Sequence, residues 1–159
     1  LRLTTPVCHD CPSVILVCRF FFKESGADRA LHSFPPAALP ISAKLSDVIS
    51  FHAHVATPTL LQALRFWQKF NRPMLCTEWL ARHVGSVFEE QLPLFSAFNC
   101  GCYQWGLVRG KTQTTLPWPV VRKGNHDYAH LWFHDVLDEY GIPFRRAEME
   151  LVRRLTRMK

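Results

Sequence analysis

A glutamate, two histidines and a tryptophan each follow or end a short apolar run of this 159-residue sequence. They are Glu78, His52, His54 and Trp105. A carboxylate can act as a nucleophile or as an acid, imidazole rings donate hydrogen bonds to hydroxyl groups, and an indole ring offers a flat surface for stacking. Together these residue types are compatible with a sugar site that offers a nucleophile or acid, hydrogen-bond donors and a face for stacking.

Each of these residues also has a structural interpretation that the sequence leaves open. A single glutamate after a strand often caps a helix or pairs with a basic side chain, which would give Glu78 a purely structural role. The two histidines are equally compatible with an exposed loop, and a tryptophan is more often a core residue than a platform for a ligand. Spacing alone therefore indicates an α/β protein with a candidate polar site.

The apolar runs that carry these residues recur at a constant interval. Three predicted strands, over residues 48–51, 74–77 and 100–105, begin 26 residues apart. Helical patterns lie between them, which is typical of βα units in a parallel sheet. Right-handed crossovers place the carboxyl ends of all three strands at one edge, where α/β folds hold their ligands.

Two helices are predicted between these strands. The first has Thr57 as its N-cap and Pro58 in its first turn. Its buried face consists of large apolar residues at helical spacing: Leu60, Leu64 and Trp67. The second begins with a capping box formed by Ser86 and Glu89.

Composition and charge narrow the class of protein. With 48% hydrophobic and 20% charged residues, the chain is globular rather than disordered. No apolar run reaches the roughly 18 residues of a membrane-spanning helix and no signal-peptide pattern is present, so no membrane partner is predicted and the location is left open. The net charge of +6 comes partly from residues 145–159, an amphipathic helical pattern with a basic solvent face. No nucleic-acid partner is therefore predicted.

Neither a metal nor an organic cofactor is predicted. Cys8 and Cys11 form a C-x2-C pair, with Cys18 beyond, but no second ligand pair follows at the spacing of a structural zinc site. The remaining cysteines lie in apolar stretches and are predicted to be small core residues: Cys76, Cys100 and Cys102. The segment 110–112 ends like a phosphate-binding loop, but Trp105 stands where that loop requires its first glycine.

Four separated segments carry a further signal: Ser46–His52, Arg72–Arg82, Tyr103–Trp118, and Trp132–Asp135 with Tyr140–Phe144. In this order they resemble the C-terminal portion of retaining (β/α)8 glycoside hydrolases of the cellulase, mannanase and xylanase type. The resemblance implies that residues 45–159 form part of a TIM barrel, namely its sixth to eighth strands and their helices. Residues 1–44 are predicted to be an N-terminal segment of uncertain structure, with a strand near 13–22 that has no recognisable partner.

The resemblance also implies roles for single residues. Glu78, at the end of strand seven, matches the catalytic nucleophile, and Trp105, at the end of strand eight, matches the tryptophan beneath the sugar in the −1 subsite. His52 and His54 match the strand-six position that lines the cleft. His54 and Gln104 stand where an aromatic residue and an asparagine are more usual, which leaves the sugar and the linkage open.

Retaining hydrolysis needs a second carboxyl group about 5–5.5 Å from the nucleophile, and in this family the acid/base follows strand four, upstream of every matched segment. Asp47 precedes its strand, Glu24 has no motif around it, and Asp127 and Asp135 follow strand eight, where they could contact ligand. The sequence, which begins with leucine, therefore predicts a fragment of a glycoside hydrolase acting on poly- or oligosaccharides, without the acid/base half of its site. The alternative is a non-catalytic carbohydrate-binding or scaffold protein derived from the barrel.

Overall fold

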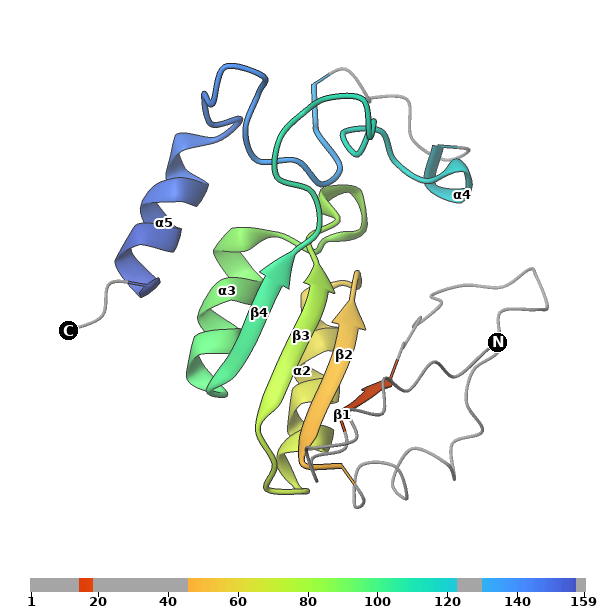
Figure 1. Cartoon of the computed structure of the whole chain (residues 1–159), viewed down its shortest axis with the longest axis vertical. Helices are drawn as coiled ribbons and strands as arrows, with labels where there is room; N and C mark the ends of the chain where they lie inside the picture. The colour runs from red at the N-terminus through yellow and green to blue at the C-terminus, as the bar shows by residue number, and fades with distance from the viewer. Residues whose placement is uncertain (1–14, 19–45, 123–129, 157–159) are drawn as a thin grey trace, which may run out of the picture.

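The computed structural model describes residues 15–18, 46–122 and 130–156, which form a parallel β-sheet with helices on one of its faces (Figure 1). The strands follow one another across the sheet in chain order, and each neighbouring pair is parallel: β1 (Ile15–Cys18), β2 (Val48–Ala53), β3 (Met74–Trp79) and β4 (Cys100–Gln104). The predicted α/β class and the three evenly spaced parallel strands are confirmed. The strand predicted near residues 13–22, for which the sequence showed no partner, is observed as β1 and pairs with β2.

Two crossover helices lie behind the sheet in the view of Figure 1. They are α2 (Thr57–Gln68), between β2 and β3, and α3 (Phe88–Ala97), which follows β3 after a 3-10 turn, η1 (Arg82–Val84). The long segment after β4 contains the short α4 (Pro119–Arg122) and ends in α5 (Arg146–Thr156), which packs beside α3. The face of the sheet turned to the viewer has no helix over it among the described residues.

The core lies between the sheet and the two crossover helices. The predicted stripe of α2 is buried there, as Leu60, Leu64 and Trp67 are at most 3% exposed. Trp79 of β3 meets two rings of α3 edge-on, with centroids 4.9 and 5.3 Å away. Burying side chains of this size contributes roughly 1.5–3 kcal/mol each. The three cysteines predicted for the core are also confirmed as buried or partly buried thiols: Cys76, Cys100 and Cys102.

Neither crossover helix has the side-chain cap that the sequence predicts. Ala56, not Thr57, is the N-cap of α2 and makes no side-chain bond, although Pro58 lies in the first turn as expected. Val87 is the N-cap of α3, one residue after Ser86. The predicted capping box is wrong because the Ser86 hydroxyl is engaged elsewhere.

Ser86 instead holds the loop that follows β3. Its Oγ accepts a hydrogen bond from the Leu80 N–H (3.2 Å) and donates one to Gln91 Oε1 (2.8 Å), while Gln91 Nε2 donates to the Val55 carbonyl (2.6 Å). Ser86 and Gln91 are fully buried. The Leu80 held in this way has φ 77°, a left-handed conformation that large side chains rarely adopt.

Replacing Ser86 with alanine should destabilise the fold by about 1–3 kcal/mol, because it leaves the buried Leu80 N–H and Gln91 Oε1 without partners. Urea unfolding followed by tryptophan fluorescence measures the effect. The matched control is Ser96→Ala on the exposed side of α3, which should change stability by no more than about 0.5 kcal/mol. Equal effects of the two substitutions would show that the Ser86 network contributes nothing.

A bulge in β3 decides where Glu78 points. Phe51 of β2 lies opposite Cys76 of β3, but the next residue, His52, lies opposite Glu78, so β3 has one extra residue at this point. In a regular strand, Cys76 and Glu78 would share a face. The bulge keeps Cys76 and Trp79 in the core and turns Glu78 toward His52, as bulges beside active sites commonly do. His52 and Glu78 thus lie within their strands, not after them as the sequence suggested.

Arg82 connects the loop after β3 to the C-terminal part of the chain. Its guanidinium donates to both carboxylate oxygens of Glu148 on α5, at 2.9 and 2.6 Å. It also donates to the backbone carbonyls of Trp132, His134 and Asp135, at 3.0, 3.3 and 3.0 Å. The side chains of Arg82 and Glu148 are both fully buried. α5 is therefore amphipathic as predicted, but its buried face includes a charged residue.

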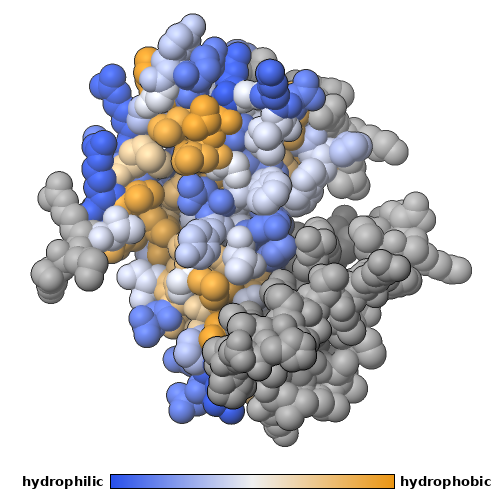
Figure 2. All heavy atoms as spheres, viewed as in Figure 1, coloured by the Kyte–Doolittle hydropathy of each residue, from blue (hydrophilic) through white to orange (hydrophobic). Residues whose placement is uncertain are grey.

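The face of the molecule turned to the viewer is mixed in character. Figure 2 shows orange, hydrophobic side chains among hydrophilic ones on this face, some of them over the loops that follow β4. The large apolar side chains of this segment include the half-exposed Leu107, Val108 and Ile142.

None of the helices within the described ranges is long and apolar enough to cross a membrane.

Candidate functional site

The structure brings three of the four predicted site residues together around one carboxylate oxygen. Glu78 Oε2 lies 3.1 Å from His52 Nδ1 and 3.5 Å from His54 Nε2. His52 lies in β2, His54 directly follows the last residue of β2, and Glu78 lies at the bulge in β3. The Glu78 side chain is 26% exposed, whereas both imidazoles are below 10%. The carboxylate can therefore reach a ligand while the histidines hold it from behind.

The environment of His54 favours its neutral form. Burial lowers the pKa of His54, while its contacts with the Glu78 carboxylate and the Leu80 carbonyl act in the opposite direction. The ring also lies edge-on to Trp118, with a centroid distance of 5.4 Å. His54 is thus packed on one side by an indole and directed on the other at the carboxylate.

Trp105 lies apart from this group. It follows the last residue of β4, its backbone N–H donates to the Trp79 carbonyl at 2.7 Å, and its side chain is 45% exposed. Among the described residues it makes no ring contact and no hydrogen bond with Glu78 or the two histidines. Its indole remains accessible, which is compatible with the stacking role predicted for it.

Two residues that the sequence did not assign belong to the group. His134 is buried, its Nδ1 lies 2.5 Å from the Leu80 carbonyl oxygen, and its ring is 5.4 Å from that of His54. The Trp118 ring contacts the rings of His54 and His134, with centroid distances of 5.4 and 5.7 Å. Both residues lie in segments that the sequence analysis had singled out. Both are too far from His54 along the chain for a local sequence pattern to reveal the contact.

The fold brings His134 to its acceptor from far along the chain. His134 and Leu80 are 54 residues apart in the sequence, and they meet only because the segment after β4 folds back over the loop after β3. His134 lies in the segment Trp132–Asp135, which the sequence analysis had singled out. Its ring contact with His54 places it beside the Glu78 group.

Several other carboxylates of the described residues are placed or engaged away from Glu78. Asp135 is fully buried, with both oxygens 2.7–2.8 Å from Thr114 Oγ1, so in this structure its carboxylate is not exposed to a ligand. Asp47 precedes β2, at the opposite end of the sheet from Glu78. Glu139 pairs with Arg109 at 3.9 Å. Glu24 and Asp127, like Cys8 and Cys11, lie outside the described residues.

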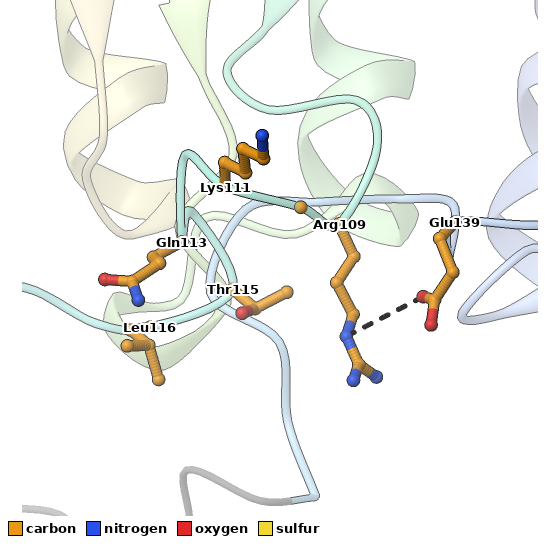
Figure 3. A pocket seen from close by; sticks show the side chains of 7 residues that line it. Arg109, Lys111, Gln113, Thr115, Leu116 and Glu139 are labelled. Atoms are coloured by element: carbon orange, nitrogen blue, oxygen red, sulfur yellow. Dashed lines mark ion pairs between the residues drawn. The ribbon is translucent and has the colours of Figure 1, made fainter.

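A separate hollow lies in the segment after β4. It has a volume of about 560 Å³, is open to solvent, and is lined by Arg109, Gly110, Lys111, Gln113, Thr115, Leu116 and Glu139. Figure 3 shows the ion pair of Arg109 with Glu139 on one side, and Lys111 pointing away from that pair. None of the predicted site residues lines this hollow.

The described residues contain no group of three or more histidines, cysteines or acidic residues arranged to hold a metal ion. No protein-family model, curated protein or solved structure matches the chain. The Glu78 group itself is therefore the basis on which a function can be assigned.

Proposed function

We propose that this chain is part of a retaining glycoside hydrolase that acts on poly- or oligosaccharides, with β2, β3 and β4 as the sixth to eighth strands of a (β/α)8 barrel. One observation carries the proposal. The Glu78 carboxylate lies near the carboxyl end of a central parallel strand, accessible to a ligand and held by two histidines of the neighbouring strand and the residues after it. Barrel enzymes place their catalytic groups at this end of their strands.

Glu78 is the nucleophile in this proposal. Its carboxylate attacks the anomeric carbon, a glycosyl ester forms as the bond to the leaving oxygen breaks, and water later hydrolyses the ester. His52 and His54 orient the carboxylate and bind sugar hydroxyls. The half-exposed indole of Trp105 supplies the surface on which the sugar stacks. No cofactor takes part.

A second candidate function is carbohydrate binding without catalysis, as a binding or scaffold protein derived from the barrel. The engagement of Asp135 and Glu148 favours it, because retaining hydrolysis needs an acid/base about 5–5.5 Å from the nucleophile. Asp135 is buried beneath Thr114, and Glu148 is clamped by Arg82. Within the described ranges, neither is available to protonate a leaving group.

Covalent trapping tests the proposed nucleophile without the acid/base. Dinitrophenyl 2-deoxy-2-fluoroglycosides have a leaving group that departs as a stable phenolate, so no proton needs to be supplied, and the fluorine slows hydrolysis of the ester. Incubation with gluco-, manno- and xylo-configured probes should raise the intact mass by one fluoroglycosyl residue. Peptide mapping should place that residue on Glu78.

Two other outcomes of the trapping experiment have clear meanings. A label on a different residue would contradict the assignment of Glu78. Glycan binding in a calorimetric titration, with no label from any of the three probes, would favour the non-catalytic candidate.

A further inference from the structure

The Leu80 carbonyl is the acceptor for two buried histidines at once. His134 Nδ1 lies 2.5 Å from the Leu80 oxygen, and His54 Nδ1 lies 3.3 Å from it. A carbonyl oxygen can only accept hydrogen bonds, so each ring must carry a proton on Nδ1 to make its bond. The loop builds this arrangement, because the Leu80 N–H is held by Ser86 Oγ and the residue has φ 77°.

The tautomer of His54 has a consequence for Glu78. A neutral ring protonated on Nδ1 has a bare lone pair on Nε2, and this atom faces Glu78 Oε2 at 3.5 Å. Two acceptors in that position repel each other unless a proton lies between them. On the imidazole, that proton makes Nε2 a donor to the Glu78 carboxylate.

His134 reaches this pair in two ways, through the Leu80 carbonyl that it shares with His54 and through the edge-on contact of its ring with the His54 ring, at 5.4 Å. Its Nε2 has no hydrogen-bond partner among the described residues, and burial lowers the pKa of its ring to about 4. His134 is therefore neutral near pH 7 and donates from Nδ1 alone. It takes the shorter of the two bonds to Leu80, which leaves the longer and weaker one to His54.

We propose that His134 is a positioning residue of the site. By sharing the Leu80 carbonyl with His54, it fixes the His54 ring with Nε2 toward Glu78 and sets how readily that ring holds a second proton opposite the carboxylate. Among the described residues, the titratable or charged groups that face the pair are His52 from β2 and His134 itself, and Arg82 faces His134. A proton on His54 Nε2 lets the ring donate to the Glu78 carboxylate and hold it in place for attack.

The consequence for catalysis rests on the proposed function, but the proton arrangement does not. Histidine side-chain NMR of the whole chain, labelled with ¹⁵N at histidine and carried on a solubility fusion, reads the tautomers directly. Resonances are assigned through single-histidine variants. We expect His134 as the neutral Nδ1–H form near pH 7, and His54 with a proton on Nδ1 at every pH. A neutral His54 protonated on Nε2 would overturn the proposal, whatever the result of glycosyl trapping.

Two variants at one position test the role of His134. Phenylalanine fills the space but donates nothing, so His134→Phe gives the Leu80 carbonyl wholly to His54 and should raise the His54 titration midpoint by about one pH unit. Asparagine keeps an N–H near the Nδ1 position, so His134→Asn should stay close to the original midpoint. A midpoint in His134→Asn equal to or above that in His134→Phe would overturn the proposal.

A third variant tests the contact between His54 and Glu78 itself and needs no change at His134. In Glu78→Gln the carboxylate that stabilises the His54 imidazolium is absent, so the His54 midpoint should fall by about one pH unit or more. An unchanged midpoint would show that the Glu78 carboxylate does not stabilise a proton on His54, and would overturn the proposal. This outcome is read from the same spectra, and it remains informative if His134→Phe fails to fold.

Discussion

Replacing Glu78 with glutamine should lower the release of dinitrophenolate from activated glycosides by about 10⁴-fold or more. The amide cannot form the glycosyl ester, while its size and its contacts with His52 and His54 are nearly retained. Sugar binding should change by no more than about threefold, because the substitution removes an interaction that Glu78 makes with the sugar in the transition state and not in the bound ground state. Initial rates with saturating substrate and a calorimetric glycan titration measure the two quantities.

The matched control for this substitution is Glu90→Gln, which makes the same chemical change on the exposed surface of α3. Its rate should equal that of the original chain. Comparable losses in both variants would mean that the amide change acts on folding, and an unchanged rate in Glu78→Gln would remove Glu78 from the mechanism. Thermal unfolding of each variant separates these explanations.

Replacing Arg82 with methionine should destabilise the fold by about 3–5 kcal/mol, the range found when one partner of a buried ion pair is removed. The change leaves the fully buried Glu148 carboxylate without its partner and three backbone carbonyls without their donor. Urea unfolding monitored by circular dichroism measures the loss. The carbonyl of His134 is one of the three, so the contact of the His134 ring with His54 should also weaken.

Arg109→Met is the control for Arg82→Met, since Arg109 and Glu139 form an ion pair whose side chains are both about half exposed. Such a pair is worth about 0–1 kcal/mol. The double variant Arg82→Met/Glu148→Met should be less destabilised than the sum of its single variants, because it leaves no buried charge unpaired. A loss below about 1 kcal/mol in Arg82→Met would contradict the clamp.

The order and type of the elements could be predicted because their signals are local. The 26-residue interval between apolar runs, the Leu60–Trp67 stripe and the basic helix near the C-terminus each depend on residues close together in the chain. Even there, the predicted helix caps were wrong. Thr57 and Ser86 have the residue types of N-caps, but the bonds that Ser86 makes are with a loop whose position the tertiary fold decides.

The site shows the same division. The sequence by itself determined that Glu78, His52 and His54 would gather at one edge, because parallel strands joined by helices end at the same edge. Alternation along a strand would have placed Glu78 on the same face as Cys76, in the core. Only the β3 bulge, a feature of pairing with both neighbouring strands, turned the carboxylate toward His52.

The tertiary structure alone decided which distant residues complete the group. His134 and Trp118 reach His54, and Glu148 reaches Arg82 across 66 residues, because the segment after β4 folds back over the loop after β3. Such contacts depend on how packed elements exclude water and satisfy buried polar groups, and no local pattern encodes that. The sequence determined the order of the elements and the position of Glu78 near the end of its strand. Packing decided on which face of the sheet the Glu78 carboxylate lies, and that His134 is the histidine beside His54.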